Sequence, residues 1–160
     1  MGMISIGIEL AVRILLVALF LPFSALDKTL NFRGAVAQAN EAVSGRGAAK
    51  ALILAGLTIE IVMPLGVLTG IADRAAAFVL AGYCGITALL WKQFWKPGDF
   101  WTSATGQGRT LFWDFLKNFA LAGGFLLLAF GTNASTVRGF FAAPFASSHP
   151  YRIERAQVSP

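Results

Sequence analysis

Residues 51–95 read ALILAGLTIEIVMPLGVLTGIADRAAAFVLAGYCGITALLWKQFW and contain two long apolar runs with a very short polar turn between them. The runs cover residues 51–72 and 75–95, and each has roughly the 20 mostly apolar residues that a helix needs to cross a bilayer. Only Asp73 and Arg74 separate them. A turn this short predicts that the two helices fold back on each other as an antiparallel hairpin.

Two further apolar runs, residues 4–25 and 110–131, flank this hairpin. The first lacks a preceding basic segment, and Phe23 stands where a cleavage site needs a small residue, so we expect a retained helix and not a secretion signal. Four such runs predict an all-α integral membrane protein. We expect residues 1–131 to form a four-helix transmembrane bundle and residues 132–160 to form a polar, basic tail.

The composition agrees with a membrane protein. Of the 160 residues, 56% are hydrophobic and 13% are charged, whereas a soluble domain has about a quarter charged residues. The net charge of +5 comes from basic residues that flank apolar runs, which favours the lipid bilayer as partner and not a nucleic acid. Cys84 is the only cysteine and His149 the only histidine, so we expect no disulfide and no metal site.

Lysine and arginine are distributed unevenly over the predicted connections. The segments after the first and third runs contain Lys28, Arg33, Arg46, Lys50, Lys92, Lys96 and Arg109. The opposite side contains Arg74, Arg138, Arg152 and Arg155. Because cytoplasmic loops are enriched in basic residues, we expect the two long loops in the cytoplasm and both termini outside.

The connection after the first run, residues 31–50, is too polar to cross a membrane. Four apolar residues recur in it at helical spacing: Phe32, Val36, Ala39 and Val43. This spacing favours a short amphipathic helix that lies in the membrane interface. A solvated loop is the alternative at this point.

Two charged residues lie far from the ends of the predicted spans. Arg13 lies in the first and Glu60 near the middle of the second, where an unpaired charge costs about 2.5–3.5 kcal/mol. Because these spans should run antiparallel, we expect Arg13 and Glu60 to lie at the same depth and to form an intramembrane ion pair. The pair would either fix the register of the bundle or take part in binding or proton movement.

A second group of polar residues lies at the ends of the spans. The first span ends at Asp27 and Lys28, and the last begins with Asp114, Lys117 and Asn118. These ends should share one side of the membrane. The residues either anchor the helices among the headgroups, with Lys117 reaching outward, or form a pocket for a quinone carbonyl or a lipid phosphate.

All four tryptophans lie in or beside the third connection: Trp91, Trp95, Trp101 and Trp113. Tryptophan rings favour the headgroup region, so an aromatic belt at the membrane surface is one interpretation. The other is a stacking wall for a flat ligand such as a quinone head, made by Trp91, Trp95 and Trp113 beside the polar pocket.

The segment 115–124 reads FLKNFALAGG. It resembles the F-x-K-N-L-A-L-x-G-G opening of the last helix in the DoxX family of small bacterial membrane proteins. Other features similar to that family are, in chain order, Arg13, Asp27-Lys28, Glu60, Gly66–Gly70 and Asp73-Arg74. The resemblance covers residues 10–131 and leaves the tail outside.

The resemblance implies a four-helix bundle in a bacterial inner membrane. Some DoxX relatives are subunits of thiosulfate:quinone oxidoreductases, and others associate with redox-stress assemblies. Relatives often carry a histidine near the end of the third helix, where this chain reads LWKQFW at residues 90–95, which weakens the transfer of a redox function.

Three functions are compatible with these features. The first is an accessory or anchoring subunit, without an activity of its own, in a larger membrane redox or respiratory assembly; its partners would be other membrane subunits. The second is a quinone-interacting oxidoreductase subunit. The third is a small-molecule or lipid transporter that uses Arg13 and Glu60. No metal or haem ligand set supports a resident cofactor, whereas a quinone or a bound lipid is compatible with the sequence.

Overall fold

The computed structural model describes residues 2–102 and 104–152, and all regular structure in them is helical. The end of the expected tail, residues 153–160 with Arg155, lies outside the described residues. The elements are α1 (Gly2–Val17), the π-helical turn η1 (Leu19–Ser24), α2 (Ala25–Leu30), α3 (Phe32–Ala42), α4 (Arg46–Thr69), α5 (Asp73–Trp91), α6 (Gln107–Phe130) and α7 (Ala134–Ala142).

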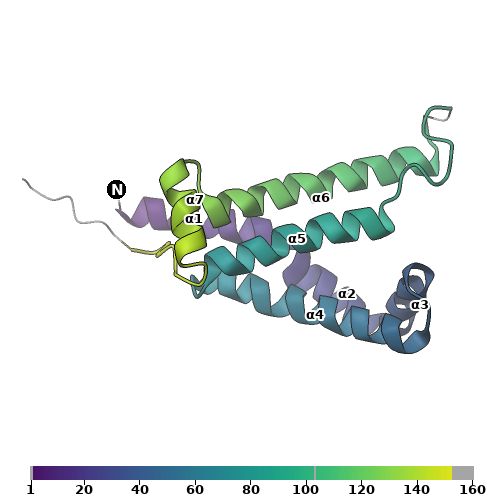
Figure 1. Cartoon of the computed structure of the whole chain (residues 1–160), viewed down its shortest axis with the longest axis horizontal. Coiled ribbons are helices and arrows are strands. Elements are labelled where there is room, and N and C mark those ends of the chain that lie inside the picture. The colour runs from purple at the N-terminus through teal and green to yellow at the C-terminus, as the bar shows by residue number, and fades with distance from the viewer. Residues whose placement is uncertain (1, 103, 153–160) are drawn as a thin grey trace, which may run out of the picture.

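Four helical segments of the described chain are long and apolar enough to cross a membrane. They are Gly2–Leu30, which combines α1, η1 and α2, and then α4, α5 and α6. Figure 1 shows that α4, α5 and α6 run lengthwise beside one another, with α1 along the same half of the molecule as α7. The four long segments agree with the four predicted apolar runs.

The predicted hairpin is confirmed in α4 and α5. Helix α4 ends at Thr69, and the next residue, Gly70, has a φ of 77°, a left-handed conformation that glycine adopts without a steric penalty. Helix α5 begins three residues after Gly70, at Asp73. The last long helix, α6, packs along the whole length of α5 (Figure 1), and a Cβ atom at Gly124 would come within 2.8 Å of Leu16 in α1.

The first long segment is bent near its middle. Leu21 has non-helical dihedral angles of −119° and 112° and is followed by Pro22, so η1 is a kink between two helices. Proline lacks the backbone N–H, and its ring disfavours a helical conformation of the residue before it. After the bend the chain continues as helix to Leu30. The predicted end of this segment at residue 25 is therefore too early, and Lys28 belongs to the helical segment.

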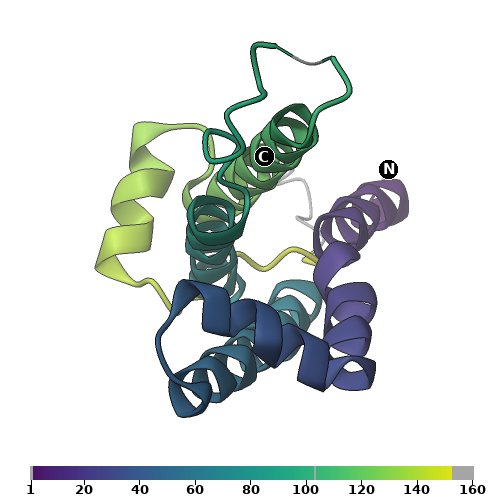
Figure 2. The same cartoon turned by 90° about the vertical axis from the view of Figure 1, so that its right-hand side faces the viewer.

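The connection after the first segment is a helix and not a loop. In α3, Val36 and Ala39 are buried and pack with Ala49 and Ile53 of α4. The polar residues of α3 are exposed. Figure 2 shows α3 crossing the end of the bundle over α4. The predicted amphipathic pattern is thus explained by packing on α4.

The residues after α6 are not a detached tail. In α7, Phe140 is buried and packs on Phe78 of α5 and Phe130 of α6, with ring centroids 5.4 and 4.9 Å apart. The Nε atom of Arg74 donates a 2.8 Å hydrogen bond to the carbonyl of Ala129 at the end of α6. The expected boundary at residue 131 therefore divides a segment that packs on the bundle, because Phe140 supplies an apolar contact.

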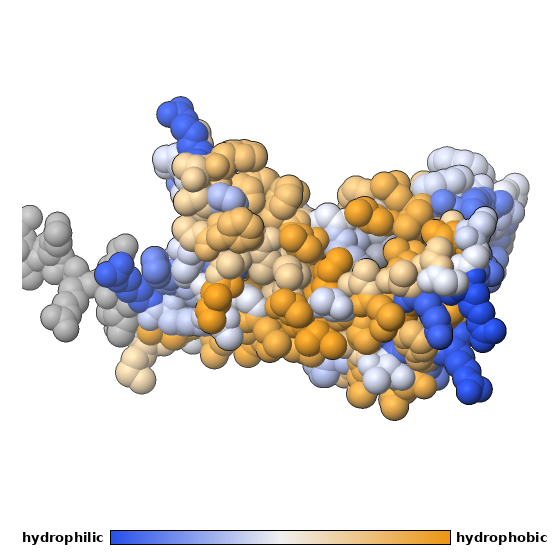
Figure 3. Space-filling view, turned by 60° about the horizontal axis from the view of Figure 1, so that its bottom comes forward, coloured by the Kyte–Doolittle hydropathy of each residue, from blue (hydrophilic) through white to orange (hydrophobic). Residues whose placement is uncertain are grey.

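In contrast to a typical soluble protein, this bundle has several charged side chains that are fully buried. The largest fully buried side chains include Arg13, Glu60 and Asp73, together with Leu80 and Phe125. On the face drawn in Figure 3, apolar side chains cover the middle of the molecule and charged ones gather toward its ends. Polar groups thus lie inside a bundle whose long sides are apolar.

We predict that Gly70→Ala destabilises the protein by about 1–2 kcal/mol, because a left-handed conformation is costly for any residue with a Cβ atom. The added atom would also come within 3.0 Å of Pro150, which lies against this turn. Gly82→Ala is the control, since a Cβ atom at this helical position meets nothing within 4 Å. Thermal unfolding in detergent should show a lower midpoint for the first variant only; equal midpoints would contradict the geometry of this turn.

Candidate functional site

A cavity of about 740 Å³ lies in the half of the bundle that contains α3 and the connection from α5 to α6. Its walls come from the bent first segment, from α3 and from the adjoining halves of α4, α5 and α6. In Figure 1 these parts lie together at the end opposite to α7. Most of the lining surface is apolar, and two groups of its polar residues are held by ion pairs.

The first group centres on Glu60, which is 2% exposed. Its Oε1 atom accepts hydrogen bonds from the Lys28 ammonium at 2.6 Å, the Tyr83 hydroxyl at 2.7 Å and the Ser24 hydroxyl at 2.9 Å. The Lys28 ammonium also donates to the Ser24 hydroxyl at 2.7 Å. These contacts join α2 and its preceding turn to α4 and α5, and all four residues line the cavity.

The second group joins the end of α5 to α6 and is more exposed. The Asp114 carboxylate of α6 forms ion pairs with Lys92 at 3.1 Å and Lys117 at 3.4 Å. The Asn118 side-chain amide donates to the Asp114 backbone carbonyl at 2.9 Å. Because the Lys117 side chain is 73% exposed and the Asp114 side chain 33% exposed, this group is more accessible than the group around Glu60.

The structure brings together most of the residues that the sequence suggested for a pocket. Asp27, Lys28, Trp91, Asp114, Lys117 and Asn118 all line the cavity. Trp95 and Trp113 are not in the lining, and about half of each side chain is exposed. Trp95 packs its ring on Phe94 instead, with centroids 5.0 Å apart. A stacking wall of three tryptophans is therefore not formed.

Sequence reasoning missed the buried half of this site. It assigned Glu60 to a different place and did not select Tyr83 or Ser24. A tyrosine in the middle of an apolar run was the available signal, because a buried phenol needs a hydrogen-bond partner. Nothing in the spacing of the residues indicated that Ser24 would lie beside it.

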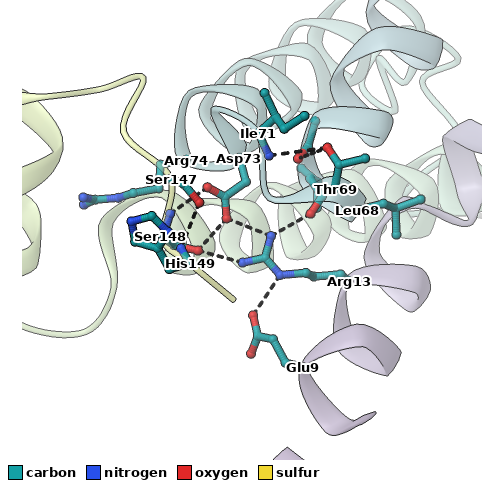
Figure 4. Close-up of polar contacts among 12 residues, drawn as sticks. Glu9, Arg13, Leu68, Thr69, Ile71, Asp73, Arg74, Ser147, Ser148 and His149 are labelled. Atoms are coloured by element: carbon teal, nitrogen blue, oxygen red, sulfur yellow. Dashed lines mark hydrogen bonds and ion pairs between the residues drawn. The ribbon is translucent and has the colours of Figure 1, made fainter. Parts of the chain in front are cut away.

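Arg13 belongs to a second buried cluster, at the end of the bundle where the chain begins and where α7 lies (Figure 4). The guanidinium is 1% exposed. It pairs with Asp73 at 2.8 Å and with Glu9 at 2.8 Å, and it donates to the Val67 carbonyl at 2.6 Å and to the Ser148 hydroxyl at 3.0 Å. This arginine therefore connects α1 with the α4–α5 turn and with the segment after α7.

Asp73 completes this cluster from the first turn of α5 and is fully buried. Its Oδ1 atom accepts a 2.9 Å hydrogen bond from the Ser148 amide, and Oδ2 accepts one from the Ser148 hydroxyl. Nearby, the Tyr151 hydroxyl donates to the Leu68 carbonyl. The segment after α7 thus covers the α4–α5 turn through polar contacts.

The predicted ion pair between Arg13 and Glu60 is wrong. Arg13 meets α4 at the Val67 carbonyl, which is seven residues beyond Glu60 and therefore about 10 Å further along the helix axis. Glu60 pairs with Lys28 instead, because the helical segment continues past Pro22 and carries Lys28 to this depth. An intramembrane transport site built from Arg13 and Glu60 is therefore not formed.

No family model, curated protein or solved structure matches this chain. Within the described residues, no group of three or more histidine, cysteine, aspartate or glutamate side chains is arranged to hold a metal ion. The site is therefore described by its geometry alone. It is a large cavity lined by a buried polar group around Glu60 and a more exposed polar group around Asp114.

We predict that Asp73→Ala lowers the free energy of unfolding by about 3–5 kcal/mol, because it leaves the buried Arg13 charge without its main partner. Glu9→Ala is a matched control, since it removes a partner of the same arginine from a side chain that is 39% exposed; we expect a loss below about 1 kcal/mol. Unfolding in mixed micelles measures both values. Equal losses would contradict the buried role of Asp73.

Proposed function

We propose that this chain is a multi-pass membrane protein that crosses the bilayer four times and binds the polar head of an amphipathic ligand in its cavity. The membrane part of the proposal is supported by four long apolar helical segments. It is also supported by large exposed apolar side chains on these helices, such as Leu15, Ile86 and Leu127. Charged groups at depth are paired inside the bundle, as a bilayer requires.

The orientation in our proposal follows from the positions of the basic residues. Arg33, Arg46, Lys50 and Lys96 lie in or next to α3 and the α5–α6 connection, at one end of the bundle. The positive-inside rule assigns this end to the cytoplasm and both termini to the outside. The bacterial inner membrane is part of the proposal because of the DoxX resemblance, which rests on the sequence motifs alone.

The observation that carries the binding function is the cavity with Glu60 at its buried end. Ligand pockets are concave and mostly apolar, with volumes of about 300–1,000 Å³ and a few convergent polar groups. This cavity has a volume of about 740 Å³, an apolar lining that includes Phe20, Ile59 and Leu121, and a buried polar group. A molecule with an apolar body and a small polar head, such as a quinone or a lipid, fits that combination.

A role within a larger assembly is the second candidate. Phe141 and Phe145, on α7 and just after it, are 71% and 77% exposed. They lie at the end opposite to the cavity, beside the segment that covers the α4–α5 turn. Two exposed aromatic side chains there favour docking on another membrane subunit. In this function the chain supplies the ligand site, and a partner subunit supplies any oxidation or reduction.

We predict that Gly34→Phe removes the bound ligand without unfolding the protein. Gly34 lines the cavity, and a Cβ atom there meets nothing within 4 Å, so the new ring has space to occupy the ligand's volume. Gly82→Phe is the control, because Gly82 has equally open surroundings but lies outside the cavity lining. Native mass spectrometry of the protein extracted in mild detergent reports both bound small molecules and stoichiometric partner subunits.

The wild-type protein and Gly82→Phe should carry a bound amphiphile, and Gly34→Phe should have lost most of it. Equal occupancy in the two variants, or no bound small molecule in the wild type, would contradict a binding function for the cavity. Partner subunits that remain in all three preparations would support the assembly role independently.

A further inference from the structure

The hydrogen bonds to Glu60 are distributed unevenly over its two carboxylate oxygens. Lys28, Tyr83 and Ser24 all donate to Oε1, whereas Oε2 accepts no hydrogen bond from the described residues although it is buried. A buried carboxylate oxygen without a donor is unfavourable. Glu60 lines the cavity, and its side chain therefore carries an acceptor that the described residues leave unused.

The cavity also contains an unused donor. The indole Nε1 atom of Trp91, at the end of α5, is buried and donates to no group of the described chain. Trp91 lines the same cavity as Glu60, and an indole N–H can only donate. The Glu60 side chain is in addition held in place by three hydrogen bonds.

From these two atoms we infer that the ligand head is a neutral hydroxyl group, which donates to Glu60 Oε2, together with an oxygen that accepts from Trp91 Nε1. The inference rests on the proposed binding function and specifies its ligand class. An ionised carboxylate only accepts hydrogen bonds, and the ion pair with Lys28 makes Glu60 such an acceptor. The head must therefore bring a hydrogen to Oε2.

This requirement separates the candidate head groups. A quinone carbonyl and a phosphate diester are acceptors only and leave Oε2 without a donor, whereas a phenolic, hydroquinone or glycerol hydroxyl supplies one. A cationic amine also has hydrogens to donate. However, the Lys28 ammonium lies 2.6 Å from Oε1 of the same carboxylate, and a second cation there would be repelled by it.

A matched pair of amphiphiles tests the inference on the full chain in nanodiscs. 4-Nonylphenol and its methyl ether, 4-nonylanisole, differ only in that a methyl group replaces the hydroxyl hydrogen in the ether. Calorimetric titration, corrected with empty nanodiscs, should give at least about tenfold tighter binding of the phenol. Equal affinities would overturn the hydroxyl assignment and leave the binding function intact. If neither compound binds, the proposed function itself is wrong.

Two variants assign the contacts to residues. Glu60→Gln replaces one carboxylate oxygen by an amide group that donates, so the preference for the phenol over the ether should disappear. Trp91→Phe keeps an aromatic ring but removes the N–H together with the five-membered ring of the indole, so it should weaken both ligands severalfold and keep their ratio. Trp113→Phe is the control, because Trp113 lies outside the cavity lining. Unchanged binding in Trp91→Phe would overturn the contact to Nε1.

Discussion

The ion pair between Lys28 and Glu60 is the interaction on which the arrangement of this bundle depends. It joins the bent first segment to α4 at 2.6 Å, and the Tyr83 hydroxyl adds α5 to the same carboxylate. Both charges lie among apolar helices, where an unpaired charge would be strongly unfavourable. The bend at Pro22 has to place Lys28 at the depth of Glu60, and the cavity is the space that remains beside this contact.

The second buried cluster gives the two halves of the molecule different properties. Arg13 and Asp73 bind the segment after α7 across the α4–α5 turn, so that half is closed. Between the two clusters lies a core of apolar residues, with Leu80 and Phe125 fully buried. The other half contains the cavity. A bundle closed at one end and hollow at the other is suited to holding a ligand head near its more basic end.

The lengths of the apolar runs were sufficient to predict the four long helical segments and the hairpin, because these features depend on local composition. The choice of ion-pair partners could not be predicted in this way. It depends on the dihedral angles at Leu21, which set how deep Lys28 lies, and spacing along a straight helix assigns Glu60 to Arg13 instead. Ser148 likewise carries no local signal for its contact with Asp73, which is 75 residues away.

A double-mutant cycle on Lys28→Met and Glu60→Met tests the central interaction most directly. Each single variant leaves one buried charge without its partner, and we predict that each loses about 3–5 kcal/mol of unfolding free energy in mixed micelles. The double variant leaves no charge unpaired, so its loss should be well below the sum of the two. If the two single losses simply add, the ion pair does not organise the bundle.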